Sequence, residues 1–158
     1  MLQINISERI PAFIWRKDDV ISVIDEKGEF IRLATSRLDY PELPLVIGEA
    51  ANLSIADISS LMEDNQYFLK EVRAFVRVGE RRWDLVLDNN LRIMLPQTEF
   101  LAAFDRLMLM SQSGSLFSNQ LSSIDMRLVE RPTVRVGAAS VDRLTYNSSG
   151  DLLSLIHI

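Results

Sequence analysis

The stretch VGERRWDLVLDNNLRIML, residues 78–95, carries the most regular pattern in the chain and decides how the rest is interpreted. Its apolar side chains at Trp83, Leu85 and Leu87 are spaced two residues apart. That period is typical of a strand with one face against a hydrophobic core. We therefore expect these three side chains to point inward.

Turn-forming residues divide residues 68–95 into three strand-like runs. Gly79 with Glu80 separates the first two runs, and Asn89 with Asn90 separates the last two. Glycine and asparagine tolerate positive φ, which tight turns between strands require. The pattern predicts an antiparallel meander in which the two asparagines form a two-residue hairpin turn.

Two carboxylates on the middle run raise the question of catalysis. Asp84 and Asp88 lie an even number of residues apart, so both should project from the face opposite Trp83. Such carboxylates are expected to be solvated, and solvated carboxylates keep ordinary pKa values and make poor acid–base pairs. A carboxylate-dependent hydrolase using Asp84 and Asp88 is therefore the alternative interpretation, and a structural role is favoured.

Arg81 and Arg82 precede the tryptophan and could clamp a phosphate or a carboxylate. Arginines in a hairpin also serve as surface charges, or pack their stems beside an aromatic ring such as Trp83. The residues alone favour this second use.

The remaining periodicities predict an α+β protein: an antiparallel or mixed β-sheet with two helices packed on one face. Residues 43–47 are expected to be a short buried run within a loop. Ser54 should cap the first helix, and one apolar stripe should run along the second. The predicted elements are strands at 2–6, 20–24, 29–33, 124–128 and 133–136, a hairpin turn at 26–28, and helices at 54–64 and 98–111, the latter with a stripe of Phe100, Leu101, Phe104, Leu107 and Met108.

Composition excludes several classes of function. The 158 residues have a net charge of −5 and no run of lysine or arginine, which argues against nucleic acid as a partner. There is no cysteine and a single histidine, so a transition-metal site lacks ligands. No phosphate-cradling glycine motif occurs either. We expect no metal, no cofactor, no small-molecule substrate and no enzymatic activity.

The segment RPTVRVGA, residues 131–138, ends the ordered pattern and reads as an edge strand. Arg131 and Arg135 fall on one face, and Pro132 stands at the entry. Edge strands expose unpaired backbone groups, which are either blunted or used by a partner that adds a strand. The pattern alone leaves these two possibilities open.

Five blocks of sequence together resemble the periplasmic part of the bacterial cell-division family FtsQ, called DivIB in some bacteria. The resemblance extends over residues 2–136, and no single block carries it. In order, the blocks are LQINISERIPAFIW (2–15), VIDEKGEFI (23–31), LPLVIGEAA (43–51), VGERRWDLVLDNNLRIMLP (78–96) and IDMRLVERPTVRV (124–136).

In that family a cytoplasmic tail, one transmembrane helix and a POTRA domain precede a β domain, at the periplasmic face of the inner membrane and at the division septum. The resemblance implies that residues 1–13 are the last strand of a truncated POTRA domain and 14–140 an FtsQ-type β domain. Residues 141–152 are expected to be a disordered tail. The final LSLIHI (153–158), which holds His157, matches a translated sequencing adapter, so we expect a gene fragment with an artefactual end.

The resemblance further implies a non-catalytic scaffold of the divisome that links early and late division proteins. FtsB, in complex with FtsL, is expected to add a strand to the last strand of the β domain. Either Arg81 or Arg82 resembles the family's sheet arginine that meets an acidic partner residue. The implied partner-binding residues are Arg81, Arg82, Leu128, Glu130, Arg131, Thr133, Val134, Arg135, Val136, Gly137 and Ala138.

One departure from the family concerns affinity. Some members carry aromatic anchors where this chain has Leu128 and Val136. Loss of a buried anchor commonly weakens an interface by a few kcal/mol, although backbone pairing needs no aromatic ring. A POTRA-type outer-membrane assembly protein is a further alternative, and it would share only the first strand.

Overall fold

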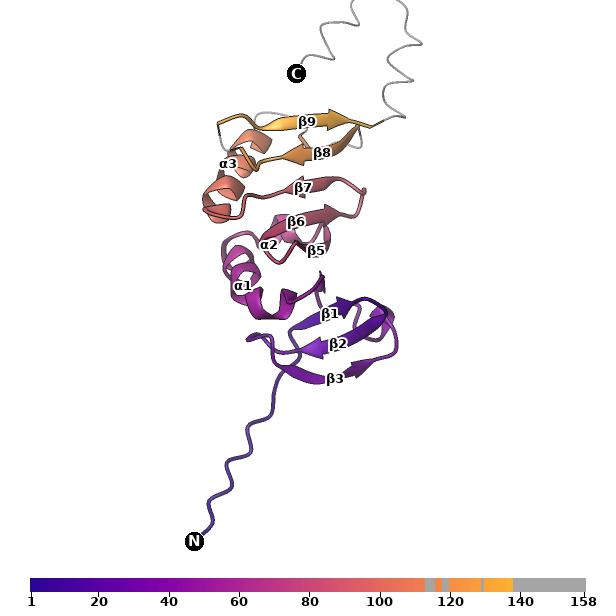
Figure 1. Ribbon diagram of the computed structural model, residues 1–158, viewed down its shortest axis with the longest axis vertical. Coiled ribbons are helices and arrows are strands. Elements are labelled where there is room, and N and C mark those ends of the chain that lie inside the picture. Colours follow the sequence, from indigo (N-terminus) through magenta and orange to yellow (C-terminus); the bar gives the residue numbers. More distant parts are fainter. Residues whose placement is uncertain (113–115, 118–119, 129, 138–158) are drawn as a thin grey trace, which may run out of the picture. The chain divides into compact units, whose positions relative to one another are not determined.

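The computed structural model describes residues 1–112, 116–117, 120–128 and 130–137. The chain divides into two compact units, the first ending at Glu80 and the second beginning at Arg81. Figure 1 labels most of the elements. They run in the order β1 (Phe13–Lys17), β2 (Val20–Ile24), β3 (Phe30–Ala34), η1 (Arg37–Asp39), β4 (Leu45–Ile47), η2 (Ala51–Ser54), α1 (Ile55–Asp64), α2 (Gln66–Leu69), β5 (Val72–Val78), β6 (Arg82–Leu87), β7 (Arg92–Met94), α3 (Phe100–Gln112), β8 (Leu121–Asp125) and β9 (Thr133–Val136).

The first unit orders its strands β3-β2-β1-β4-β5. Strand β1 pairs antiparallel with β2 and parallel with β4, and β4 is also parallel to β5. Parallel neighbours need a long crossover, and α1 lies in the one between β4 and β5. The short buried run predicted within a loop at residues 43–47 contains strand β4, which is paired on both sides, and Val46 is fully buried.

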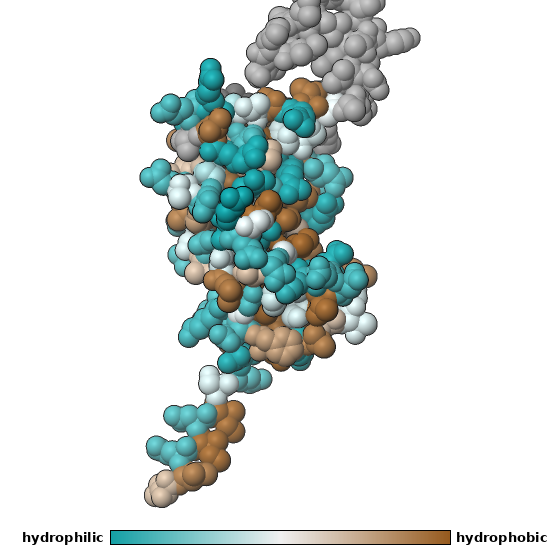
Figure 2. Space-filling model, in the orientation of Figure 1, coloured by the Kyte–Doolittle hydropathy of each residue, from teal (hydrophilic) through white to brown (hydrophobic). Residues whose placement is uncertain are grey.

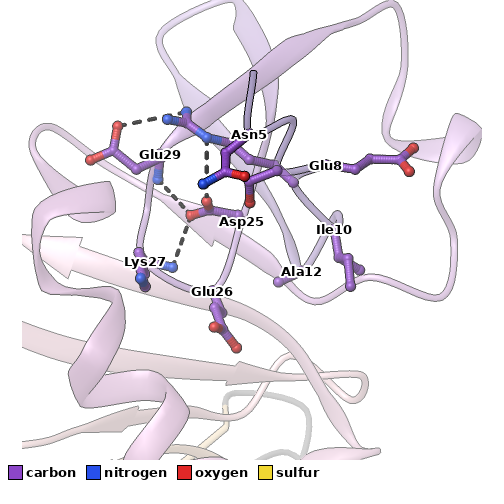
Figure 3. Close-up of a pocket in the computed structure, with 10 residues that line it drawn as sticks. Asn5, Glu8, Ile10, Ala12, Asp25, Glu26, Lys27 and Glu29 are labelled. Carbon is purple, nitrogen blue, oxygen red and sulfur yellow. Dashed lines mark hydrogen bonds and ion pairs between the residues drawn. The ribbon is translucent and has the colours of Figure 1, made fainter. Parts of the chain in front are cut away.

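The hairpin predicted between residues 20–24 and 29–33 is confirmed as β2 and β3. Gly28 adopts φ +83° in its turn, and a Cβ there would lie 1.9 Å from the carbonyl oxygen of Asn52. Asp25 fixes the same turn, because its Oδ1 accepts the backbone N–H groups of Lys27 and Glu29, each at 2.9 Å. Figure 3 shows these contacts beside a cavity of about 640 Å³.

The second unit orders its strands β6-β7-β8-β9. Strands β6 and β7 are antiparallel, β7 and β8 are parallel, and β8 and β9 are antiparallel. Helix α3 lies in the crossover between the parallel pair. Trp83, Leu85 and Leu87 are buried, as the alternation predicts.

The predicted fold class, α+β with a mixed sheet, is confirmed. The packing of both helices on one face stays a prediction. Each unit contains both parallel and antiparallel strand pairs and one longer helix, α1 or α3.

The helix predictions need two corrections. Helix α1 ends where predicted, but Ser54 makes no side-chain capping hydrogen bond, because a 3-10 helix precedes it without a break. Helix α3 buries Ala103, Phe104 and Leu107, while Leu101 is 40% exposed. The buried stripe of α3 therefore includes the small Ala103 and does not include Leu101.

Three strand predictions also change. Residues 1–12 form no helix or strand, so the strand predicted at 2–6 is wrong: no described segment pairs with it, and an unpaired strand lacks its ladder of hydrogen bonds. In Figure 2 this segment keeps hydrophobic side chains along one side. Strand β8 lies at 121–125 instead of 124–128. The hairpin after β6 has three loop residues instead of two, because the N–H of Leu87 donates to the carbonyl of Leu91 and Asn90 takes φ +66°.

Candidate functional site

Strand β9 is the last strand of the second unit, and β8 is its one strand partner among the described residues. A β-bulge at Ser122 interrupts β8, whereas β9 runs without an extra residue. The predicted edge strand is therefore present and regular.

Hydrogen bonds reveal which backbone groups of β9 are open. In an antiparallel ladder, alternate residues direct both their N–H and their C=O to the same neighbour. Gly137 donates its N–H to Gln120 O at 2.8 Å, and Ser122 Oγ donates to Arg135 O at 3.2 Å. Residues 133, 135 and 137 therefore face β8, and the N–H and C=O groups of Val134 and Val136 point away from it.

The side chains of the edge follow the same alternation. Thr133 and Arg135 are exposed, and Val134 and Val136 are half-buried on the opposite face. Gly137 is half-buried, and Ala138 lies outside the described residues. In the preceding segment Leu128, Glu130 and Arg131 are all exposed, and a turn closes where Arg131 N–H donates to Leu128 O at 3.0 Å.

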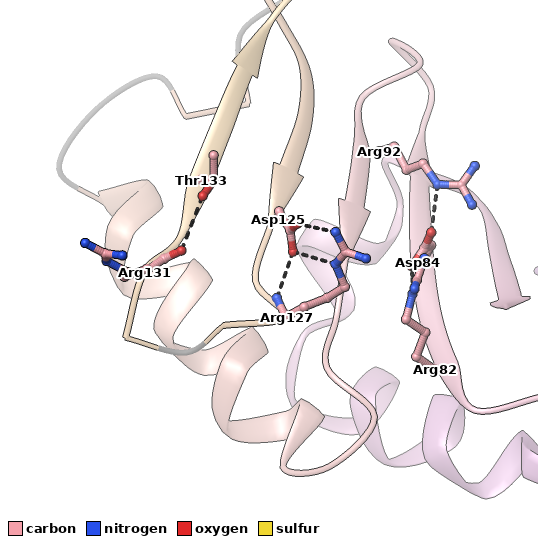
Figure 4. A network of polar contacts seen from close by, with 7 residues as sticks. All are labelled: Arg82, Asp84, Arg92, Asp125, Arg127, Arg131 and Thr133. Atoms are coloured by element: carbon pink, nitrogen blue, oxygen red, sulfur yellow. Dashed lines mark hydrogen bonds and ion pairs between the residues drawn. The ribbon is translucent and has the colours of Figure 1, made fainter. Parts of the chain in front are cut away.

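Asp84 corrects the prediction of a solvated carboxylate. Its side chain is 0% exposed, and its two oxygens accept from two arginines. Arg82 Nε donates to Oδ1 at 3.2 Å, and Arg92 Nε donates to Oδ2 at 2.7 Å (Figure 4). Asp84 does project from the face opposite Trp83, but the two guanidinium groups cover it and exclude water.

Asp88 lies apart from this cluster. It follows the end of β6 and is exposed, as predicted. A catalytic pair needs two carboxylates that share one reacting centre, whereas one of these is sealed by arginines and the other is in solvent. Neither aspartate lines the cavity of about 640 Å³ or another of about 280 Å³, which lie among residues 5–29 and 37–72. The geometry gives the hydrolase interpretation no support.

A second carboxylate on the same face is also engaged by an arginine. Asp125 accepts from Arg127 Nε at 2.9 Å and from Nη2 at 2.6 Å (Figure 4). The Arg127 side chain is the main cause that holds the pKa of Asp125 below its ordinary value, while burial opposes this shift. The same pairing raises the pKa of Arg127. Both groups are therefore charged at neutral pH.

The two candidate arginines differ in their surroundings. Arg82 lies on β6 and is held by Asp84, with its side chain 25% exposed. Arg81 is exposed and precedes the strand. Sequence reasoning missed Arg92, which shares Asp84 with Arg82 and has a side chain 45% exposed. The signal was present, because the hairpin pairs Arg92 with Val86 and so places it on the face of the sheet that carries Asp84.

In the described part of the chain, no group of three or more histidine, cysteine, aspartate or glutamate side chains could hold a metal ion. Among the same residues, no helix has the length and apolar character needed to cross a membrane.

Comparison with known proteins gives the family. Residues 13–127 match the family described as "Cell division protein FtsQ/DivIB, C-terminal". A cell division protein FtsQ from Jannaschia sp. (strain CCS1) is 39% identical over 144 residues, which make up 90% of this chain and 46% of that relative. The FtsQ of Dinoroseobacter shibae is 36% identical, with 91% of this chain and 48% of the relative covered.

A third relative, FtsQ of Roseobacter litoralis, is 35% identical over 86% of this chain and 46% of its own length. The chain thus spans about half the length of these curated relatives. The matched residues include most of the strands of both units. The chain therefore belongs to the FtsQ/DivIB family of cell division proteins and carries its C-terminal domain.

Proposed function

We propose that this chain is the partner-binding β domain of a non-catalytic divisome scaffold, which binds FtsB together with FtsL by strand addition to β9. The observation that carries the proposal is the open edge of β9, where Val134 and Val136 direct their N–H and C=O groups away from β8. In the cell this domain would act at the periplasmic face of the inner membrane, at the division septum, and link early and late division proteins.

The edge restricts how a partner strand pairs. Pro132 has no N–H, so the outward donors of the described strand begin at Val134. The partner strand therefore pairs across Val134 and Val136, with up to four backbone hydrogen bonds. Ala138, two residues beyond Val136, would continue this row.

Side chains beside the edge supply the remaining contacts. Leu128 is an apolar side chain that is 69% exposed, so it offers area that a partner can bury. Arg131, Arg135 and Thr133 lie on the exposed polar side, with Glu130 next to them in the chain. Because Leu128 and Val136 are aliphatic, we expect lower affinity than in members with aromatic anchors at these positions.

We further propose Arg82, in preference to Arg81, as the arginine that meets an acidic partner residue. Arg82 is held on the polar face of the sheet, whereas Arg81 precedes the strand. A strand added to β9 would lie four strand spacings, about 19 Å, from β6. Arg82 would therefore contact a different part of the partner than the added strand.

Titration of the periplasmic segment of the cognate FtsB onto the chain tests the edge proposal. Val134→Pro removes one outward donor without removing a hydrogen bond to β8. We expect it to weaken binding at least about tenfold, because a partner carbonyl is left unpaired. The matched control is Val134→Ala, which shortens the same side chain but keeps the N–H and should bind much more tightly than the proline variant. Equal binding by the proline variant and the unmodified chain would rule out pairing at this edge.

A further inference from the structure

Asp84 is a fully buried carboxylate on the face of β6 that also carries Arg82 and Val86. Removing a carboxylate from water is costly unless charged donors replace the water. Here both oxygens are matched, each by the Nε of a different arginine, at 3.2 and 2.7 Å. The three groups form one unit, which we call the Asp84 trio: Arg82, Asp84 and Arg92.

Strand pairing explains the shape of the Asp84 trio. Arg82 precedes Asp84 by two residues on β6, so both side chains emerge from the same face. On β7, Met94 is opposite Asp84, and Arg92 is opposite Val86. The two arginines thus approach Asp84 from opposite directions along the strand and bracket it.

The way in which each arginine binds leaves its other donors available. Each guanidinium uses Nε toward Asp84, so the paired Nη1 and Nη2 donors remain at its far end. Within the part of the chain that the structure describes, these Nη groups of Arg82 and Arg92 make no hydrogen bond to protein. A carboxylate can bind bidentately to the Nη1 and Nη2 groups of one guanidinium group.

We propose that Asp84 is a positioning residue that holds Arg82 and Arg92 as a two-pronged anchor for an acidic side chain of the partner. This inference rests on the proposed function and adds Arg92 as a second contact residue. Two guanidinium groups share one carboxylate, so the Asp84 trio carries a net charge of +1 on a chain whose total is −5. The buried carboxylate fixes long side chains that would otherwise lose rotamer freedom on binding, so less entropy is lost when the partner docks.

The proposal predicts an effect opposite to that of charge alone. Removing the negative charge of Asp84 makes the face more positive, and long-range electrostatics would then strengthen and speed the binding of an acidic partner. If Asp84 acts by positioning, its removal instead weakens binding. The sign of the change therefore separates the two roles.

The test uses the same FtsB periplasmic segment and the variants Asp84→Asn, Arg92→Gln and their combination. We expect Asp84→Asn to weaken binding about tenfold, mainly through faster dissociation. Arg92→Gln should weaken it as well, and the double variant should bind about as poorly as the worse single variant, because Asp84 acts through the arginines. The NMR signals of the Arg82 and Arg92 Nε–H groups should shift in Asp84→Asn and, in the unmodified chain, on addition of the segment.

A check for folding accompanies these measurements. Asp88→Asn removes a carboxylate near the end of the same strand, from an exposed position, and serves as the matched control that should leave binding unchanged. Dispersed amide NMR spectra of Asp84→Asn establish that the variant folds. If Asp84→Asn does not fold, the cycle is repeated with Arg82→Gln and Arg92→Gln, and additive losses from these two would overturn the shared anchor.

The outcomes separate this inference from the proposed function. Tighter or unchanged binding by Asp84→Asn, while Val134→Pro abolishes binding, overturns the positioning role and leaves the edge proposal standing. Weaker binding by Asp84→Asn while Val134→Pro binds normally supports the anchor and overturns the edge proposal. Absence of any binding by the unmodified chain overturns both.

Discussion

Strand β3 begins the strand order of the first unit and strand β9 ends that of the second, and their open edges differ. Strand β3 has a β-bulge at Ile31, an extra residue opposite the step from Val23 to Ile24. In the second unit the bulge lies on β8, so β9 stays regular. Bulges twist an edge and spoil it as a template for another strand.

An arginine adds to this difference. Glu29 directs its carbonyl to Asp25 N–H on the β2 side, so the carbonyl of Phe30 points outward, where Arg9 Nη1 donates to it at 3.2 Å. On β9 no such contact covers Val134 or Val136 among the described residues. An unpaired edge is therefore not enough to identify a binding site. A bulge and Arg9 obstruct the edge of β3, whereas the edge of β9 is open to a further strand.

The largest expected effect comes from breaking the turn that holds β3. Gly28→Ala would force a residue with a Cβ into φ +83° and bring that Cβ against the Asn52 carbonyl. Backbone strain and the steric clash together should lower the free energy of unfolding by about 3 kcal/mol or more. Chemical denaturation of the variant measures this change. A loss below about 1 kcal/mol would show that the turn can rearrange and that β3 is less firmly held than described.

Two proline substitutions in β9 test which backbone N–H groups face β8 and which point away from it. Arg135→Pro removes an N–H that faces β8 and leaves a carbonyl of that strand unpaired, which should destabilise the unit by about 2 kcal/mol. Val134→Pro removes an outward N–H and should cost less than about 1 kcal/mol in stability. Thermal or urea unfolding of the two variants checks this order. The reverse order would place the free edge groups on the wrong residues.

Sequence patterns predicted the strands well where the side-chain period alone decides the structure. The inward row of Trp83, Leu85 and Leu87 and the edge at 133–136 are confirmed. The period also gave the correct face for Asp84 but not its burial, because burial depends on how the long arginine side chains from β6 and the neighbouring strand fold over it. The strand at 2–6 failed for a related reason: alternation favours a strand, but only a paired neighbour forms one.

The smallest stability effect is expected from opening the β3 edge. Arg9 is about half exposed and pairs with Asp25 at 3.9 Å and Glu29 at 3.8 Å, so Arg9→Ala should lower stability by less than about 1 kcal/mol. Denaturation at neutral pH measures this loss, and Arg16→Ala, at an exposed arginine of β1, is the control. A loss well above 1 kcal/mol would mean that Arg9 anchors more than the turn.

The same variant should change the pH dependence of stability. Burial by itself would raise the pKa of Asp25, but the N–H groups of Glu29 and Lys27, assisted by the charge of Arg9, outweigh it and lower the pKa. Because the folded-state pKa is depressed, the stabilisation is present above the unfolded-state pKa and is lost as the pH falls below about 4. Arg9→Ala should lose less stability than the unmodified chain over this acidic range. An identical acid dependence would exclude a contribution from Arg9.

Amide hydrogen exchange at β9, measured by NMR with and without the FtsB segment, tests the central claim most directly. In the free chain we expect fast exchange at Val134 and Val136 and slower exchange at Arg135, whose N–H faces β8. At saturation with the segment, exchange at Val134 and Val136 should slow by at least about tenfold, while Arg135 changes little. Binding that leaves the amides of Val134 and Val136 unprotected would contradict strand addition at this edge.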